Sequence, residues 1–295
     1  MEKAIFLTLS ALGDILCTTP VLRAFRKQHP HTKIFYIAQS AGFTRVLDHN
    51  PDIDLTIYSD RLFINGMPDQ LTDWLRSLPI DLRQAATLYR LDLKFACTSE
   101  EAFRKHMSYS FARLVGVELD SVRPVVVLTE SDRRGAAVFT DRPYVVFSMH
   151  SVTNPERHDG RGRKKNWPVE NWEKLATLIA KQTGHDIFAV GAENEPPLPL
   201  PYVHRLYGLP IRVVAALLER SACVVTLENG IAHLSAAVDA PMVEIYANMM
   251  PLEWAYPAEA TRCQVLYGDP LDISCDEVFQ AVEATLANRS PKKCL

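Results

Sequence analysis

The sequence lacks the segments that mark secreted, membrane-spanning and disulfide-stabilised proteins. No apolar run approaches the roughly 20 residues that a membrane-spanning helix needs. The N-terminal stretch MEKAIFLTLSALGD becomes polar too soon for a signal peptide. Six cysteines are present without a Cys-x-x-Cys pair, which favours buried thiols in a reducing compartment. From these absences we expect a cytoplasmic protein.

The signature motifs of several enzyme classes are missing as well. No Gly-x-Gly-x-x-Gly follows a predicted strand, and neither a P-loop nor a Gly-x-Ser-x-Gly motif occurs. The nine histidines form no His-Glu-x-x-His motif. A net charge of −3 gives no basic surplus of the kind that nucleic-acid-binding proteins carry. We therefore expect no metal, no cofactor and no nucleic-acid partner.

The chain does contain enough apolar sequence for two domains. It has 295 residues, 47% of them hydrophobic, and near-continuous apolar runs alternate with helical patterns along its length. This alternation is typical of α/β proteins with parallel sheets covered on both faces. We predict one domain over residues 1–141 and a second over 142–295, joined by a polar linker at 130–142, with a ligand cleft where the strands end. The final helix belongs to the second domain or packs back on the first.

Local signals add three expectations. Pro20 should lie near the start of the first helix, because proline inside a helix removes a hydrogen bond. Segment 124–128 is predicted as a strand and segment 69–78 as a helix.

The stretch 223–238 has the clearest local pattern. Residues 224–227 predict a buried strand, Glu228-Asn229-Gly230 a tight turn, and the apolar residues that follow recur at helical spacing. A helix that begins there directs free N–H groups over the strand tip, where an anion could bind. Glu228 could accept hydrogen bonds from a ligand, and His233 is near enough to assist with a phosphate. An ordinary buried strand entering a helix has the same pattern, so that alternative stays open.

Three further segments carry candidate side chains. Asp14 follows the first strand and could take a proton from a hydroxyl, or simply stabilise a helix N-terminus. The loop 157–165 holds five arginines and lysines among nine residues and could close over a diphosphate, with Lys165 the best placed. Glu195, beyond a strand tip, could bind ribose hydroxyls. Solvated loop residues would explain the last two patterns as well.

Four motifs occur in order: Leu-x-x-Leu-Gly-Asp-Ile-Leu-x-Thr-Thr-Pro at 9–20, Lys-x-Trp-Pro at 165–168, Gly-x-x-x-Glu at 191–195 and Gly-x-x-His-Leu-x-Ala-Ala at 230–237. Together they resemble glycosyltransferase family 9, the bacterial heptosyltransferases of lipopolysaccharide core synthesis, over nearly the whole chain. The resemblance implies a GT-B fold, in which two Rossmann-like parallel-sheet domains face a central cleft. It also implies an ADP-heptose donor bound by the C-terminal half, an acceptor bound by the N-terminal half, and inverting transfer without a metal.

The same resemblance implies roles for single residues. Asp14 matches the general base, and Gly13 belongs to the acceptor-side loop. The residues implied to bind the donor through its phosphates or its nucleoside are Thr153, Lys165, Glu195, Glu228, Asn229, Gly230 and His233.

Two departures from the family pattern keep other functions open. The family usually has Asp-Thr/Ser-Gly where this chain has Glu228-Asn229-Gly230, and Gly-Pro-Thr where this chain has Ala-Asn-Met-Met at 247–250. The alternatives are a transferase for a UDP-sugar or GDP-sugar, and a non-catalytic paralogue that binds a nucleotide sugar.

The expected partners are a nucleotide sugar and a saccharide or lipid-linked saccharide acceptor. An enzyme with a lipid-linked acceptor works at the inner membrane face, yet the chain has no strong amphipathic anchor. We therefore expect at most peripheral association with the inner membrane through basic residues. The candidates, which a solvated helix face explains equally well, are Arg23, Arg26, Lys27 and Lys33.

Overall fold

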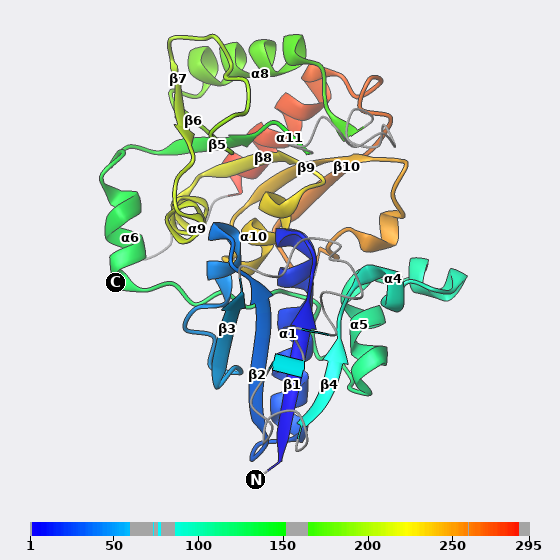
Figure 1. Cartoon of the computed structure of the whole chain (residues 1–295). Coiled ribbons are helices and arrows are strands. Elements are labelled where there is room, and N and C mark those ends of the chain that lie inside the picture. Colours follow the sequence, from blue (N-terminus) through cyan, green and yellow to red (C-terminus); the bar gives the residue numbers. More distant parts are fainter. Residues whose placement is uncertain are drawn as a thin grey trace. The chain divides into compact units, whose positions relative to one another are not determined.

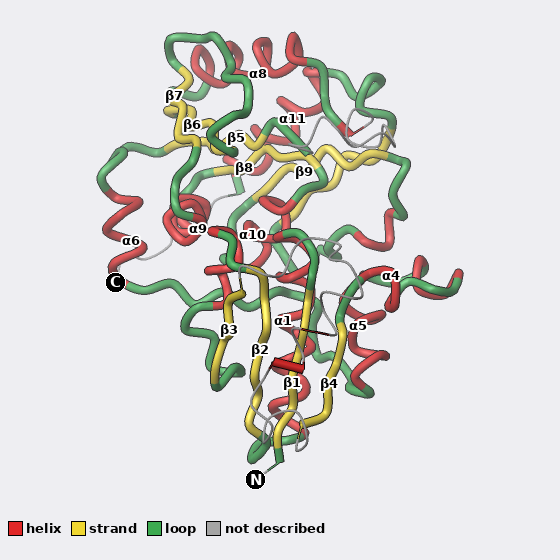
Figure 2. The backbone as a smooth tube through the Cα atoms, in the orientation of Figure 1, coloured by secondary structure: helices red, strands yellow, loops and turns green. Residues whose placement is uncertain are grey.

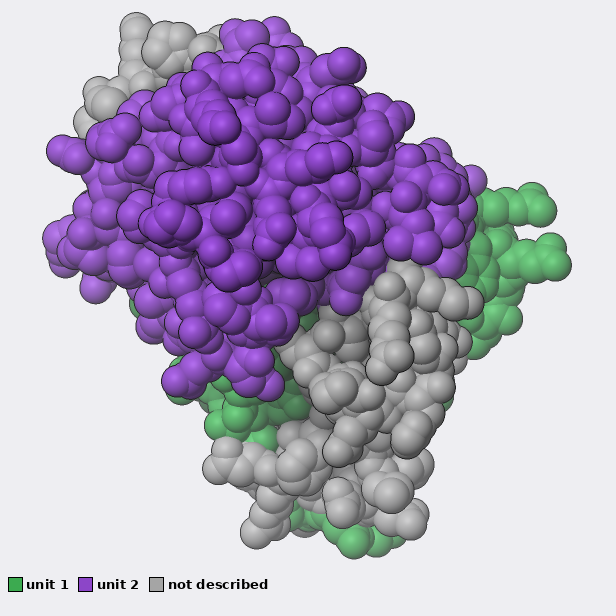
Figure 3. All heavy atoms as spheres, turned by 90° about the horizontal axis from the view of Figure 1, so that it is seen from above, with its two compact units in different colours: residues 1–128 green, residues 129–295 purple. Residues whose placement is uncertain are grey.

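The structure is a computed structural model that describes residues 2–59, 73, 76–77, 86–151, 165–258 and 260–288. The chain forms two compact units, residues 1–128 and 129–295, which Figure 3 colours separately. The division falls before helix α6 (Glu130–Ala137), whereas the sequence predicted it after residue 141. The predicted linker is thus largely a helix, begun by a reciprocal capping box between Thr129 and Asp132.

Two ion pairs explain why α6 belongs to unit 2. Arg133 Nε lies 2.8 Å from Glu219 Oε2, and Arg212 Nη2 lies 2.6 Å from Asp132 Oδ2. Glu219 and Arg212 are both on helix α9 (Ile211–Arg220), against which α6 packs. The capping residue Asp132 therefore also serves the contact between the two helices.

Unit 1 is built on a four-stranded parallel sheet in the order β3-β2-β1-β4 (Figure 1 and Figure 2). Helix α1 follows the central strand β1 directly and packs on α5. The strands are β1 (Lys3–Thr8), β2 (Lys33–Gln39), β3 (Leu55–Ser59) and β4 (Ala86–Arg90). The helical segments are α1 (Leu12–Gln28), η1 (Gly42–Leu47), α4 (Leu93–Ala96), η2 (Glu100–Phe103) and α5 (Met107–Val115).

Pro20 lies inside α1 and not near its start, so that prediction is wrong. A proline at this position leaves the Leu16 carbonyl without its usual N–H partner four residues on. The Thr19 hydroxyl compensates, because it donates to the Leu16 oxygen at 2.7 Å. The same hydroxyl accepts a hydrogen bond from Val125 N at 2.7 Å. One threonine thus supports both the helix and the segment that follows α5.

Unit 2 contains a six-stranded parallel sheet in the order β10-β9-β8-β5-β6-β7. Helices α8 and α11 lie on one face, and α9 and α10 lie on the other (Figure 1). The strands are β5 (Tyr144–Ser148), β6 (Asp186–Gly191), β7 (Val203–Tyr207), β8 (Cys223–Leu227), β9 (Met242–Ala247) and β10 (Cys263–Gly268). The remaining helical segments are α8 (Val169–Gln182), α10 (Gly230–Ala237), η3 (Leu252–Trp254) and α11 (Cys275–Ala287).

The core of unit 2 gathers on the α8 and α11 face. Trp167 and Trp172 meet there edge to face, with ring centroids 5.1 Å apart, and the Trp167 indole donates to the Ile273 carbonyl at 2.8 Å. Residues of α11, including Val278 and Val282, belong to this same core. The final helix therefore packs on α8 and on the sheet of unit 2 itself.

The structure corrects the assignment of three segments. Residues 124–128, predicted as a strand, are not paired in a sheet. Strands β7 and β10, which the sequence did not predict, extend the sheet of unit 2 at its two edges. The predicted helix at 69–78 lies largely outside the described residues.

Among the helices that are described, none is both long and apolar enough to cross a membrane.

Candidate functional site

The carboxyl ends of neighbouring strands β5 and β8 carry the densest group of candidate side chains. The two strands pair in parallel, from Val145 with Cys223 to Ser148 with Thr226, so both end at the same edge of the sheet. Strand β8 leads through Glu228 and Asn229 into α10. The predicted strand, turn and helix are confirmed here.

Asn229 joins β5 to α10 at this edge. As the N-cap of α10, its side-chain oxygen accepts hydrogen bonds from Ile231 N at 2.8 Å and Ala232 N at 3.3 Å. Its amide nitrogen donates to Ser148 Oγ and to the His150 carbonyl oxygen, both at 3.0 Å. The end of β5 is therefore attached to the first turn of α10 through one side chain.

Lys165 and Glu228 form an ion pair beside that turn. Each side chain is 15% exposed, so the pair is largely shielded from water. Burial raises the pKa of the Glu228 carboxyl, and the nearby Lys165 ammonium opposes that shift. The Glu228 carbonyl also accepts from Ser151 Oγ at 2.7 Å, which is a second link to the segment after β5.

A further acid, Glu244, lies on the next strand of the sheet. It is in register with Thr226 and is 3% exposed on the α9 and α10 face. The Cys263 thiol donates to its carboxylate at 3.6 Å. Burial, with the neighbouring Glu228 charge, raises the pKa of Glu244 to about 8. Two acids and one lysine thus share this end of the sheet.

His233 lies on the first turn of α10, as predicted. A ring nitrogen, Nδ1, is 2.8 Å from the Tyr256 hydroxyl, and the two rings meet edge to face. Burial lowers the pKa of His233 to about 4, with a smaller contribution from Lys165. The imidazole is therefore neutral near pH 7 and can offer a hydrogen bond, but no positive charge.

Glu195 stands at the end of β6, where the predicted Gly-x-x-x-Glu turn forms. Its carboxylate folds over Gly191 so closely that a Cβ on that glycine would lie 2.0 Å from Oε2. Burial raises the pKa of Glu195, and the charge of His150 opposes the shift. The neighbouring Tyr207 has a pKa raised to about 12, first by burial and then by Glu195. His150 Nε2 lies 3.2 Å from the Pro196 oxygen, so the end of β5 reaches this turn as well.

Unit 1 carries the other predicted residues. Gly13 and Asp14 lie in the first turn of α1, directly after β1 and its short connection. Asp14 is half-buried at the amino end of the helix, where the helix dipole favours a carboxylate. Burial is the main cause of the raised pKa values of Tyr36 and Cys97, and the charge of Asp14 adds to both shifts.

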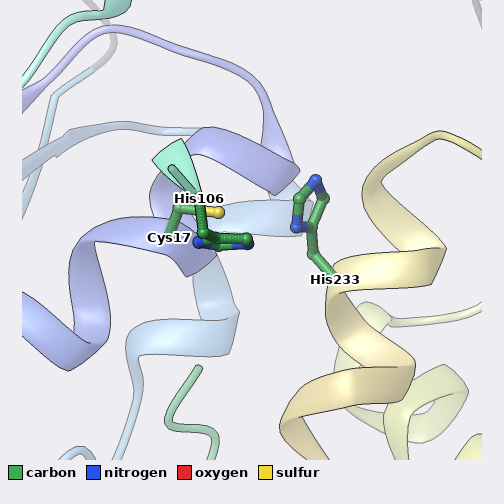
Figure 4. Close-up of side chains that lie close together, drawn as sticks. All are labelled: Cys17, His106 and His233. Atoms are coloured by element: carbon green, nitrogen blue, oxygen red, sulfur yellow. The ribbon is translucent and has the colours of Figure 1, made fainter. Parts of the chain in front are cut away.

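Cys17 and His106 lie close together in unit 1 (Figure 4). The Cys17 sulfur and a ring nitrogen of His106 are within 4.8 Å, and His106 caps α5 by accepting from Ser108 N at 3.3 Å. Protein metal sites generally use three or four ligands, so these two groups of unit 1 do not by themselves form one. Figure 4 also draws His233, which belongs to α10 of unit 2.

One group of predicted residues lies largely outside the described residues, and a second group is paired within unit 1. Thr153 and nearly all of the basic loop lie outside the described residues, and only its last residue, Lys165, is described. The basic residues proposed for membrane contact are all paired with carboxylates. The pairs are Arg23 with Asp52, Arg26 and Lys33 with Asp54, and Lys27 with Asp120. Their charges are thus partly neutralised within the unit.

Sequence reasoning missed four residues of the site region: Ser148, His150, Tyr207 and Glu244. Ser148 and His150 carried a usable signal, because Ser148 ends the apolar run of β5 and His150 lies two residues beyond it. Glu244 stands inside an apolar run, and an acid in such a run is a signal for a special environment. Tyr207 ends a strand that was not predicted.

Comparisons with known proteins identify the family of the chain. A model of glycosyltransferase family 9 (heptosyltransferase) matches residues 85–272, which is more than half of the chain. Lipopolysaccharide heptosyltransferase 1 of Escherichia coli is 26% identical over 147 residues, 48% of this chain and 42% of that protein. The Salmonella typhimurium protein of the same description is 29% identical over 115 residues, 37% and 33% of the two chains. The chain spans less than half the length of these curated relatives in the matches.

Solved structures resemble the chain over its full length. A glycosyltransferase family 9 protein of Veillonella parvula has a TM-score of 0.74 at 18% identity, covering 98% of both chains. The E. coli ADP-heptose lipopolysaccharide heptosyltransferase II has a TM-score of 0.71 at 15% identity, covering 97% of this chain and 99% of that one. These likenesses confirm the predicted fold class, two parallel-sheet α/β domains of the GT-B type. The family match and the order of the motifs establish that the chain belongs to glycosyltransferase family 9.

Proposed function

We propose that the chain is an inverting, metal-independent glycosyltransferase that transfers heptose from ADP-heptose to a hydroxyl of a saccharide acceptor. The acceptor would be part of the lipopolysaccharide core or a related glycan. A lipid-linked acceptor would bring the enzyme to the inner face of the inner membrane as a peripheral protein.

The observation that carries the proposal is the group of residues at the carboxyl edge of the unit 2 sheet. Open α/β sheets bind nucleotides at this edge. Lys165 is the described cation there, and it stands beside the start of α10, whose N–H groups favour an anion. In the proposal, Lys165, Gly230 and His233 bind the donor diphosphate, assisted by Thr153. Glu195 then accepts from the donor ribose, and Glu228 sets the position of the Lys165 ammonium.

In the proposal, Asp14 acts as the general base. Its carboxylate takes the proton of the acceptor hydroxyl as the oxygen attacks the anomeric carbon in line with the departing diphosphate. Attack on the face opposite the leaving group inverts the anomeric centre. Negative charge develops on the diphosphate in the same step, where the Lys165 ammonium stabilises it. Gly13, beside Asp14 in the first turn of α1, has no side chain that could obstruct the acceptor.

The choice of an ADP-sugar is supported by relatives of the same fold. E. coli heptosyltransferase WaaC has been solved with ADP and with ADP-2-deoxy-2-fluoro heptose. Those two structures have TM-scores of 0.67 and 0.64 with this chain. Because the turn at 228–230 departs from the family pattern, the preference for adenine over other nucleotide bases has to be measured.

The test is a comparison of three nucleotides followed by one variant. The purified protein is titrated with ADP, UDP and GDP, and its thermal midpoint is followed, since a ligand that binds the folded state raises the midpoint. We expect ADP to act at concentrations where the others do not. A preference for UDP or GDP would refute the ADP-sugar, and the lack of any shift would count against a donor site that recognises the nucleotide.

The variant Asp14→Asn then separates chemistry from binding. We expect turnover of ADP-heptose with a lipopolysaccharide-core acceptor to fall by about 100-fold or more, while the ADP dissociation constant stays within about 2-fold of the wild type. A parallel loss of both would contradict the role of a base.

A further inference from the structure

We propose that Asn229 is a positioning residue of the donor site: its carboxamide joins the end of β5 to the start of α10, and it does not itself bind the donor. This inference rests on the proposed function for the identity of the donor. The attachment of the two elements is a property of unit 2 alone. The resemblance to glycosyltransferase family 9 had instead implied a direct donor contact for Asn229.

The hydrogen-bonding capacity of the Asn229 side chain is fully used. A carboxamide offers two N–H donors and an oxygen with two lone pairs. Both donors are engaged, by Ser148 Oγ and by the His150 carbonyl. The oxygen accepts from Ile231 N and Ala232 N, and the Thr226 hydroxyl also donates to it at 3.2 Å. A phosphate or ribose group would have to displace one of these internal contacts.

The orientation of the carboxamide follows from its surroundings. Two backbone N–H groups, which can only donate, face the oxygen, and a backbone carbonyl, which can only accept, faces the nitrogen. Exchanging the two atoms would break three of these contacts. The chemistry of the neighbours therefore requires an amide at this position.

Other capping residues could not make the same connection. A serine or threonine hydroxyl can accept from the first N–H groups of a helix, but it is too short and too poor in donors to reach both Ser148 and His150. An aspartate would keep the cap and turn a carboxylate oxygen toward the His150 carbonyl, where two acceptors repel. Asparagine alone combines the cap with two donors.

The connection matters because β5 leads into both parts of the proposed donor site. On one side, Ser151 donates to the Glu228 carbonyl, next to the Lys165 ion pair. On the other side, His150 Nε2 lies 3.2 Å from the oxygen of Pro196, the residue that follows Glu195. A displaced segment 148–151 would thus disturb the proposed phosphate and ribose contacts together.

The experiment compares Asn229→Ser, Ser148→Ala and the double variant. Ser148 is 3% exposed and its hydroxyl bonds the Asn229 amide, so we expect any effect of Ser148→Ala on ADP binding to act through the connection. We expect Asn229→Ser to weaken ADP binding by about 10-fold and Ser148→Ala by about 3-fold. The double variant should bind ADP at most about 1.5-fold more weakly than Asn229→Ser does, because both changes remove the same contact. Asn288→Ser, at the exposed end of α11, is the matched control.

A kinetic measurement separates positioning from loss of folded protein. With saturating acceptor, we expect Asn229→Ser to raise the donor KM by about 10-fold and to change kcat by less than about 3-fold. A general loss of structure would lower the apparent kcat at an unchanged KM, and that result would overturn the proposal. Additive effects of the two single variants on ADP binding would overturn it as well, because they would indicate a direct contact by Asn229.

Hydrogen exchange of the ligand-free protein keeps this proposal distinct from the proposed function. Exchange over residues 146–151 should become faster in Asn229→Ser and stay unchanged in Asn288→Ser. If the wild type binds no nucleotide but the exchange responds, the proposed function fails and the connection stands. Unchanged exchange in Asn229→Ser would refute the connection whatever the wild type binds.

Discussion

Replacing Glu244 with glutamine should remove a loss of stability that unit 2 suffers as the pH rises. The Glu244 carboxyl is buried on β9, with Glu228 as a like-charged neighbour and the Cys263 thiol as a weak donor. These surroundings favour the protonated acid, and the pKa is raised from 4.5 to about 8. The native state therefore holds a proton near pH 7 that the unfolded chain has released.

The sign and size of the effect follow from proton linkage. Where the native state binds more protons than the unfolded state, the free energy of unfolding falls as pH rises, by about 1.4 kcal/mol per pH unit for one group. The stability is fully present below the unfolded pKa and is lost as pH rises to the folded pKa. Over the roughly three and a half pH units between these values, the ceiling is about 5 kcal/mol. Glutamine is neutral throughout and should avoid this loss.

The assay is urea unfolding of wild type and Glu244→Gln from about pH 5 to about pH 8. Trp167, Trp172 and Trp254 all belong to unit 2, so tryptophan fluorescence reports mainly on that unit. We expect similar midpoints at the acid end and an advantage of about 2 to 5 kcal/mol for the variant at the alkaline end. Glu283→Gln, on the exposed side of α11, is the matched control. If the free energy of unfolding changes with pH in the same way in Glu244→Gln and wild type, the reasoning is refuted. A constant difference between the two proteins would reflect only the packing of the amide.

Two further substitutions test contacts in the two units. Gly191→Ala would place a Cβ 2.0 Å from the Glu195 carboxylate and should weaken ADP binding by about 10-fold through displacement of that carboxylate. Gly42→Ala, with no atom near its Cβ, is the control. Equal ADP titration curves for the two variants would contradict a role for the Glu195 turn. Thr19→Val keeps the shape of the side chain and removes the hydroxyl that serves the Leu16 carbonyl inside α1. It should lower the free energy of unfolding of unit 1 by about 2 kcal/mol, and unchanged thermal unfolding by circular dichroism would show that the carbonyl has another partner.

The parts of the fold that could be predicted are those with local causes. Strand β8 is a continuous apolar run and is buried on both faces, so its composition alone identified it. Helix α10 begins at an asparagine cap and a glycine, which are strong local signals. The edge strands β7 and β10 expose part of their side chains and carry mixed polar residues, so no apolar run marked them.

Other features depend on contacts between distant residues. Pro20 was expected near a helix start because the rule for proline considers only the backbone. The Thr19 hydroxyl, which replaces the missing donor, made the helix interior possible. The boundary between the units was missed for a similar reason, since α6 is polar like a linker and is attached to unit 2 by Arg212, far along the chain.

The candidate site shows the same division between local and distant causes. The motifs identified Lys165, Glu195 and the 228–230 turn one by one. Each lies near the carboxyl end of a strand or the start of a helix. Nothing local indicated that Lys165 is paired with Glu228, 63 residues away. The pairing changes the electrostatics of the site, because the ammonium is already balanced by a carboxylate within unit 2.

The two departures from the family pattern in the turn have a common physical interpretation. At position 228 the chain has the longer acid, which pairs with Lys165, and at position 229 it has an amide in place of a hydroxyl, which holds the end of β5. Both side chains make their contacts inside unit 2. If they do not face the donor, the changed turn need not change the base that the enzyme accepts. The nucleotide comparison and the Asn229 variants therefore test the same idea. If the changed residues of the turn contact only unit 2, the wild type should still prefer ADP, and the effects of the Asn229 and Ser148 variants should be coupled.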